Sequence, residues 1–177
     1  IITKDFLKKI VSDAASRNQF SFTREILQGR RDDFKIMGYK HDGFFTKIDS
    51  IQDYYLANRM LLDPEKKNAL FRKDMPVLTK IGDNGPVKYG LESSIKDSLI
   101  ADGCIIEGTV INSILFRGVK VGKDSVVKDC VLLQGTKVGE NCSISSVIAD
   151  KNVEISNEKV LTGSETYPLY IGKGGKI

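Results

Sequence analysis

The sequence has few residues of the types that form metal centres or reactive thiol pairs. It contains one histidine, His41, and three cysteines, with no Cys-x-x-Cys pair and no histidine near any cysteine. Tetrahedral metal sites and redox motifs normally use such clusters. We therefore expect no metal site, and we predict that the cysteines are small buried residues of a protein in the reducing cytoplasm.

The sequence also lacks a long apolar run. A membrane-spanning helix needs about 20 consecutive apolar residues, and no segment approaches that length. Charged side chains within residues 4–9 do not fit a signal peptide. These features predict a protein with no membrane partner. Because the chain begins Ile1-Ile2 without a methionine, we interpret it as part of a longer protein.

A basic stripe of the kind that binds nucleic acid is missing as well. The formal net charge is +4 and the pI is about 8.9, but lysines and acids are interleaved, as in 63–67 and 120–124. Such mixed charge is typical of a solvated surface. We expect no nucleic-acid partner, and a phosphorylated metabolite is the better candidate for an anionic partner.

What the sequence does contain is a hexapeptide repeat between Ile95 and Ile155. Each unit begins with an aliphatic residue and has a small or modest side chain near its fifth position, as at 100–105, 106–111, 121–126 and 138–143. An amphipathic α-helix has a period of about 3.6 residues and a half-buried strand a period of 2, so neither explains the pattern. The repeat is instead typical of a parallel β-helix.

A second marker gives the length of one coil. Four-residue apolar segments begin at Ser113, Cys130 and Ser146, which are 17 and 16 residues apart. Three hexads make a coil of about eighteen residues, and corner loops tolerate small deletions. The aliphatic residues would fill the interior, with Cys104, Ser125 and Cys142 at tight corners. We predict a mainly β fold of roughly three to four coils, which must stack on one another and on a partner because no single coil buries its apolar face.

The pattern before the repeat is that of an α/β domain. Residues 5–14 have helical spacing, and residues 23–27 start a short helix that Gly29 ends. Residues 34–36 and Phe44-Phe45 have the pattern of two strands separated by a turn.

Ser50 and Asp53 form a capping box that starts another helix, which Asp63-Pro64 is expected to end. We therefore predict that 1–71 is the C-terminal part of an α/β domain, 72–94 a linker and 95–177 a β-helix with a C-terminal tail.

An α/β remnant followed by a hexapeptide β-helix resembles the C-terminal half of a sugar-nucleotide pyrophosphorylase, in particular glucose-1-phosphate adenylyltransferase (ADP-glucose pyrophosphorylase). The segments that carry the resemblance are 48–62, 86–89, 98–108 and 112–116, and together they extend over nearly the whole chain. The resemblance implies a nucleotidyltransferase-like α/β domain and a left-handed β-helix, an exception to the usual right-handed crossover.

The resemblance also implies a reaction. ATP and glucose 1-phosphate would give ADP-glucose and pyrophosphate, with Mg and ATP as the cofactors of an intact tetrameric enzyme. The family's Gly-rich nucleotide loop is not in this chain. We therefore expect no cofactor and no catalytic residue within the chain itself.

One segment departs from the catalytic members of the family. Their strand before the capped helix has an aromatic-x-Asp-Val-Gly-Thr pattern that faces the sugar phosphate and its metal, and Phe45, Lys47 and Asp49 occupy the corresponding positions. A lysine ammonium has three donors and no acceptor, so it cannot ligate magnesium. The segment therefore resembles the GlgD-type branch, a regulatory subunit that assembles with a catalytic adenylyltransferase subunit in glycogen biosynthesis. Alternatively, Asp49 replaces the missing acid, because a residue two places on keeps the same strand face.

The resemblance implies control by a phosphorylated sugar bound where the two domains meet. Arg30, Arg31, Lys88 and Lys120 are candidates by their chemistry, although each is also open to interpretation as an ordinary surface charge. The segment 172–176, Gly-Lys-Gly-Gly-Lys, looks like a phosphate loop. No helix follows it, so we predict a frayed tail.

Two other classes remain open. Hexapeptide β-helices also occur in acyltransferases, which use a histidine as general base near a coenzyme A cleft. His41 lies beside a predicted turn and outside the repeat, so we interpret it as a surface residue. The remaining class is a β-helix that serves assembly and regulation only, as a homo-oligomer or with a catalytic subunit, through contacts of 95–155.

Overall fold

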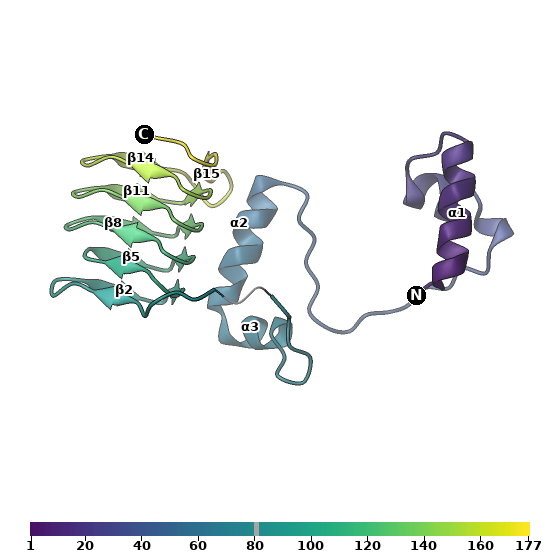
Figure 1. Cartoon of the computed structure of the whole chain (residues 1–177), viewed down its shortest axis with the longest axis horizontal. Coiled ribbons are helices and arrows are strands. Elements are labelled where there is room, and N and C mark those ends of the chain that lie inside the picture. Colours follow the sequence, from purple (N-terminus) through teal and green to yellow (C-terminus); the bar gives the residue numbers. More distant parts are fainter. Residues whose placement is uncertain (80–81) are drawn as a thin grey trace. The chain divides into compact units, whose positions relative to one another are not determined.

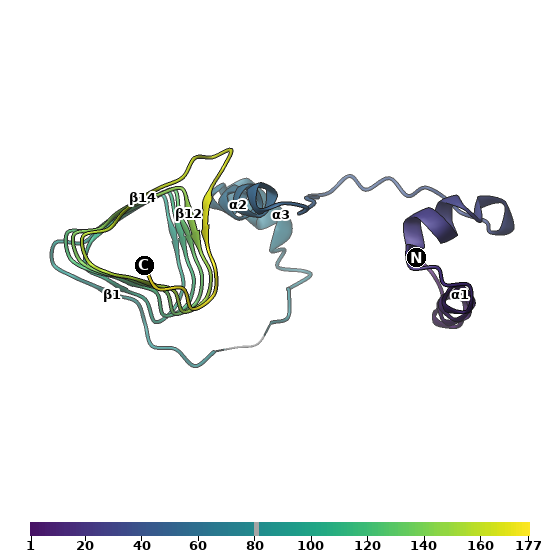
Figure 2. The same cartoon turned by 90° about the horizontal axis from the view of Figure 1, so that it is seen from above.

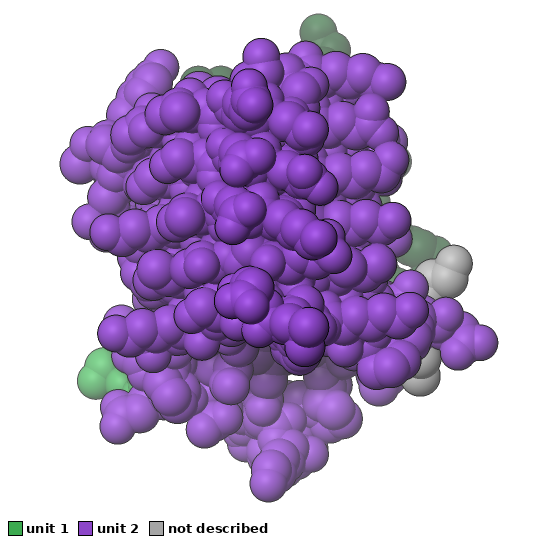
Figure 3. Space-filling view, turned by 90° about the vertical axis from the view of Figure 1, so that its left-hand side faces the viewer, with its two compact units in different colours: residues 1–42 green, residues 43–177 purple. Residues whose placement is uncertain are grey.

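The computed structural model describes residues 1–79 and 82–177, and positions 80 and 81 of the predicted linker lie outside the described residues. The chain divides into two compact units, residues 1–42 and residues 43–177, which are coloured separately in Figure 3. Each unit is described by itself. None of the described helices combines the length and the apolar character that crossing a membrane requires.

The first unit is a small helical cluster. It consists of α1 (Lys4–Ser16), the π-helical segment η1 (Phe22–Gln28) and the 3-10 turn η2 (Arg31–Asp33), so both predicted helices are confirmed. Ile10, Ala14 and Ile26 form its buried core, against which Phe34 packs.

The two strands predicted at 34–36 and Phe44-Phe45 are wrong. These residues are irregular, and none of them belongs to one of the three described sheets. A strand is stable only where its backbone N–H and C=O groups bond to a neighbouring strand. The ring of Phe34 instead meets Phe6 edge-on, with the ring centroids 5.5 Å apart.

The second unit begins with three short helical elements, α2 (Ile51–Arg59), η3 (Met60–Leu62) and α3 (Pro64–Leu70). The predicted cap is confirmed, because the Ser50 hydroxyl accepts a hydrogen bond from the Asp53 N–H at 3.0 Å. The predicted end at Asp63-Pro64 is confirmed, because the helical run stops at Leu62 and the backbone of Asp63 is extended. A new helix begins directly after it. Asp63 accepts a hydrogen bond from the Glu65 N–H and so caps α3, in which Pro64 occupies the first position that its fixed φ favours.

The rest of the unit is a prism of three parallel five-stranded sheets (Figure 1). Sheet A contains β1 (Lys88–Tyr89), β4 (Ile105–Ile106), β7 (Lys120–Val121), β10 (Lys137–Val138) and β13 (Glu154–Ile155). Sheet B contains β2 (Ser94–Lys96), β5 (Thr109–Ile111), β8 (Val126–Lys128), β11 (Ser143–Ser145) and β14 (Val160–Thr162). Sheet C contains β3 (Leu99–Ile100), β6 (Ile114–Leu115), β9 (Val131–Leu132), β12 (Val147–Ala149) and β15 (Leu169–Ile171).

The prism is a left-handed parallel β-helix, as expected. Seen from the end where the chain finishes, successive strands of sheets A, B and C follow one another clockwise while the coils rise towards the viewer (Figure 2). The strand β1 lies inside the range 72–94 that the sequence assigns to a linker. The stacked coils appear as parallel ridges on the face of this unit shown in Figure 3.

The interior of the prism contains the repeated aliphatic residues and the small corner residues. Cys104, Cys130 and Cys142 are free and buried, which confirms the prediction for the cysteines. Burial raises the pKa of the Cys130 thiol to about 12. The Ser125 hydroxyl donates to the Gly139 carbonyl at 2.6 Å and accepts from the Cys142 N–H at 2.9 Å, so these corners link successive coils.

The frayed tail predicted at 172–176 is wrong. The Glu154 N–H donates to the Gly175 carbonyl at 2.9 Å, and the Ser156 N–H donates to the Ile177 carbonyl at 2.8 Å. The Lys176 ammonium also lies 3.2 Å from the Glu154 carboxylate. Because the last coil would otherwise expose an unpaired strand edge, the tail gains backbone partners by continuing the stack.

Candidate functional site

The helix α2 packs against the outer face of sheet C (Figure 1). Tyr55, Val131 and Ile148 are buried together at this contact, and partly buried apolar side chains of the helix and of the sheet surround them. The segment 45–49, which the sequence identifies as a degenerate sugar-phosphate site, leads directly into this helix. The C-terminal end of this segment therefore lies beside the β-helix.

Four polar side chains hold the helix at the corner between sheets B and C, and we name them the α2 anchor: Tyr55, Arg59, Asn112 and Asp129. The Tyr55 hydroxyl donates to the Asp129 carbonyl at 2.6 Å. The Asp129 carboxylate accepts from the Arg59 guanidinium at 2.9 Å and from the Asn112 amide at 2.5 Å. Partial burial raises the pKa of the Tyr55 hydroxyl. The anchor therefore pairs the Tyr55 hydroxyl and the terminal nitrogens of Arg59, which the docked helix removes from water. The buried Arg59 Nε has no hydrogen-bond partner among the described residues.

Two of the anchor residues have an unusual backbone conformation. Asn112 and Asp129 occupy equivalent corners of successive coils with φ of 47° and 52°. Asn and Asp tolerate this left-handed conformation better than other non-glycine residues. The same side chains thus form the corner and present their polar atoms to α2.

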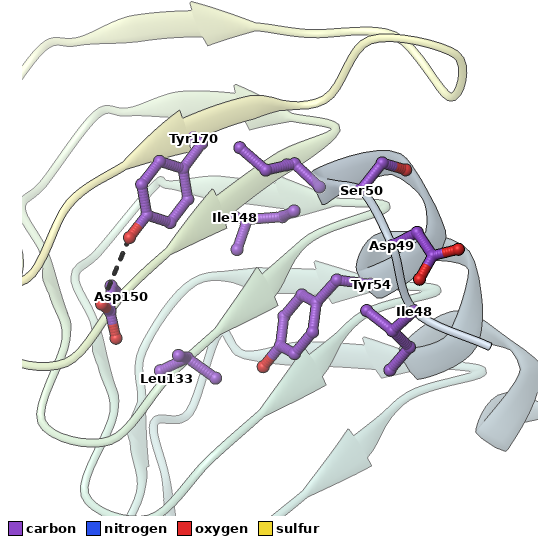
Figure 4. A pocket seen from close by; sticks show the side chains of 9 residues that line it. Ile48, Asp49, Ser50, Tyr54, Leu133, Ile148, Asp150 and Tyr170 are labelled. Atoms are coloured by element: carbon purple, nitrogen blue, oxygen red, sulfur yellow. Dashed lines mark hydrogen bonds between the residues drawn. The ribbon is translucent and has the colours of Figure 1, made fainter. Parts of the chain in front are cut away.

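A cleft of about 630 Å³ lies between the N-terminal half of α2 and sheet C, and we name it the α2–sheet C cleft. Its lining is mostly apolar and aromatic (Figure 4): Ile48, Asp49, Ser50, Ile51, Tyr54, Leu133, Ile148, Asp150 and Tyr170. The Tyr170 hydroxyl donates to the Asp150 carboxylate at 3.3 Å. Partial desolvation, reinforced by this carboxylate, raises the pKa of Tyr170.

Asp49 is the predicted site residue that borders this cleft. Its carboxylate lies 2.5 Å from the Lys47 ammonium, and this hydrogen bond raises the pKa of Lys47. Phe45 is exposed in the same irregular segment. The lysine that stands where the family has an acid thus pairs with Asp49, the carboxylate proposed as its replacement.

The residues present do not fit the magnesium site of the catalytic enzymes. No group of three or more His, Cys, Asp or Glu side chains that could hold a metal ion occurs within 1–79 and 82–177. The Asp49 carboxylate, engaged by Lys47, supplies no free ligand. We therefore assign no step to a metal in this chain.

The four effector candidates are divided between the two units, with one pair in each. Lys88 and Lys120 lie in strands β1 and β7 of sheet A, in register with Ile105 between them. Arg30 belongs to the first unit, where its guanidinium lies 2.5 Å from the Asp13 carboxylate. This ion pair lowers the pKa of Asp13.

Arg31 is also in the first unit and is exposed, 3.7 Å from Asp32. Because Arg30 is engaged in a partly buried ion pair, Arg31 is the one of these two candidate arginines whose charge faces solvent.

The sequence did not identify the anchor or the cleft. Both join segments far apart in the chain, as with Tyr55 and Asp129, and neither has a recognisable local motif. One signal was available, because Asn112 and Asp129 are 17 residues apart, the length of one coil. Polar residues repeated at a corner indicate stacking, but not which element they contact.

Comparison with known proteins identifies the relatives of this chain. Residues 87–166 match the family described as GlmU-like, C-terminal hexapeptide. The chain is 34% identical over 174 residues to glycogen biosynthesis protein GlgD of Bacillus subtilis (strain 168), covering 98% of this chain and 50% of the relative. It is 38% identical over 116 residues to GlgD of Geobacillus stearothermophilus, covering 52% of this chain and 34% of the relative.

Enzymes of the same group are also similar. Glucose-1-phosphate adenylyltransferase of Bacillus thuringiensis (strain Al Hakam) is 30% identical over 162 residues, covering 90% of this chain and 42% of the enzyme. The chain spans about half the length of these relatives or less. The resemblance to GlgD and to glucose-1-phosphate adenylyltransferase is thus confirmed over nearly the whole chain.

Proposed function

We propose that this chain is part of a GlgD-type subunit that regulates or assembles a glucose-1-phosphate adenylyltransferase in glycogen biosynthesis. The observation that carries the proposal is the similarity to GlgD over 98% of the chain, together with a lysine at the position of a catalytic acid.

The physical reason for a non-catalytic role is the charge at position 47. Adenylyl transfer to a sugar phosphate needs magnesium to neutralise charge that builds up on the phosphates, and carboxylates to hold the metal. Lys47 removes one acceptor and adds a positive charge beside the cation, while Asp49 is bound to Lys47. The lysine still attracts a sugar phosphate, so binding without turnover is the expected behaviour.

We also propose the setting that the family resemblance implies. The protein works in the cytoplasm, where glycogen precursors are made, and associates with a catalytic adenylyltransferase subunit in a tetramer. A phosphorylated sugar is the proposed effector. Its exposed candidate contacts in the second unit are Lys88 and Lys120.

The test compares three preparations: the complete protein alone, a catalytic adenylyltransferase alone, and the two reconstituted. We expect ADP-glucose formation near background for the protein alone, and altered turnover or effector response in the pair. Substituting Lys47→Ala in the complete protein should leave its own activity near background. Robust turnover by the isolated protein, unaffected by Lys47→Ala, would show that the residue and the branch are both misassigned.

The acyltransferase alternative has no specific observation in its favour. The only histidine of the chain, His41, lies in an irregular segment outside the coils. An acyltransferase of this architecture would need its general base beside the β-helix. Acetyl-coenzyme A binding measured by calorimetry separates the two classes, and we expect none.

A further inference from the structure

The N-terminal end of α2 lies among exposed apolar and aromatic side chains. We name this region the α2 docking surface: Ile48, Ile51, Tyr54, Tyr167 and Tyr170. A second groove of about 500 Å³ adjoins the α2–sheet C cleft and shares Ile51 and Tyr170 with it. Tyr170 is 48% exposed, and Tyr167 is more exposed still. Exposed patches rich in tyrosine are typical of protein interfaces.

The rim of this surface is acidic, although the chain as a whole has a net charge of +4. Asp49, Asp53 and Asp150 stand at or beside the cleft, and Glu165 precedes Tyr167 in the adjoining loop. Lys47 offsets Asp49, and Arg59 lies near Glu165 as well as Asp129. Within the described residues, the hydrogen bonds of Asp53 and Asp150 come from hydroxyl or backbone groups rather than from cations.

We propose that the α2 docking surface receives a basic segment of the catalytic partner subunit, with an apolar side chain in the cleft and an arginine or lysine beside Asp150. Phenol rings attract a cation over their faces, and a carboxylate beside them adds charge. Tyr54 on the helix side and Tyr170 and Asp150 on the sheet C side supply this combination at the cleft (Figure 4). The proposal rests on the proposed function, because it assigns a surface to that partner.

A second copy of this chain fits the surface less well. A two-fold symmetric contact brings the same patch of each copy together. The acidic rims of the two copies would then lie in one interface, and like charges in an interface disfavour association. The charge of the rim therefore favours a different, basic partner surface.

The test uses the buried native thiols. Because Cys104, Cys130 and Cys142 are all buried, a single cysteine introduced into this chain is its reactive thiol in the folded state, and peptide mapping of the labelled protein assigns the dye to that position. Tyr170→Cys places it on the docking surface, and Val160→Cys provides the control. Val160 is 74% exposed in β14, in the same last coil but on sheet B. Each complete variant is labelled with a maleimide dye, alone and with the catalytic adenylyltransferase subunit.

We expect position 170 to label readily in the protein alone and at least about tenfold more slowly in the complex, with position 160 unchanged. Labelling of 170 that stays fast in a complex of verified mass would overturn the docking surface and leave the proposed function standing. Position 170 already protected in the protein alone would show that another part of the protein, or a second copy, covers the surface. Failure of the wild-type pair to associate would overturn the proposed function as well.

A charge reversal tests the chemistry of the partner. Asp150→Lys should weaken association by about tenfold or more, with a reduced dependence on salt, because a carboxylate that attracts the partner becomes a repelling cation. Glu140→Lys makes the same change at an exposed corner away from α2 and should alter affinity by less than about twofold. Equal affinity of the two variants would overturn the basic-segment assignment. Unchanged burial of the native thiols shows that both variants are folded.

Discussion

Substituting Asp129→Asn is the most direct test of how α2 is held on the β-helix. The asparagine keeps the size of the side chain, and it tolerates the φ of 52° at this corner. What it removes is the negative charge that accepts hydrogen bonds from Arg59 and Asn112. The hydrogen bond from Tyr55 to the backbone carbonyl of residue 129 is retained.

The magnitude follows from the burial of the pair. The side chains of Arg59 and Asp129 are 20% and 21% exposed, so solvent screens their interaction only in part. Hydrogen bonds to a charged group contribute about 1.5–3 kcal/mol, and neutral ones about 0.5–1.5 kcal/mol. Losing the charge at two such bonds should destabilise the docked helix by about 2 kcal/mol, which corresponds to about a thirtyfold change in its opening equilibrium.

The assay is hydrogen exchange of the α2 amides, because the helix can open without unfolding the β-helix. We expect exchange within α2 to accelerate by about thirtyfold in Asp129→Asn, while the amides of sheets A and B keep their protection. Asp129→Ala should lose about 1–2 kcal/mol more, since alanine is strained in the left-handed conformation.

Asp124→Asn provides the matched control. Asp124 has a φ of 56° at an exposed corner between sheets A and B, away from α2. Its substitution should leave α2 exchange unchanged. If Asp129→Asn also leaves it unchanged, the apolar contacts of Tyr55 alone hold the helix, and the role assigned to the anchor is wrong.

Three further outcomes are expected. The native thiols, represented by Cys130 with its pKa of about 12, should not react with Ellman's reagent at pH 8 until the protein is unfolded; reaction in the native protein would contradict the packing of the coils. Gly139→Ala should lower stability by about 1–3 kcal/mol in thermal denaturation, because a Cβ there would lie 2.7 Å from the Asn157 backbone nitrogen, whereas Gly172→Ala, with open space around it, should be neutral. The hydrogen bond from the Ser50 hydroxyl holds the pKa of Asp53 below its ordinary value of 3.8. The stabilisation of the α2 cap is therefore present above that value and disappears as the pH falls through the lower pKa of the folded state. Asp53→Asn should remove this acid dependence of α2 helicity, and an unchanged acid transition would show that Asp53 does not cap the helix.

Local features of the sequence determined the elements whose partners recur at a fixed spacing. The aliphatic residue at the start of each hexad points inward in every coil, so the interior follows from the repeat itself, whichever coil is considered. The cap at Ser50 is also local, because donor and acceptor are three residues apart. Lys47 could be identified as a departure because one residue type lacks the acceptor that the chemistry needs.

Tertiary structure decided everything that depends on contacts between distant segments. Residues 34–36 are not a strand because no described segment offers them hydrogen-bond partners. The tail at 172–177 is ordered because the last coil does offer it such partners. Where α2 docks on sheet C, Tyr55 of the helix donates a hydrogen bond to the backbone carbonyl of Asp129 at one corner of the coil. No periodicity encodes such a contact, since its geometry exists only after the coils have stacked.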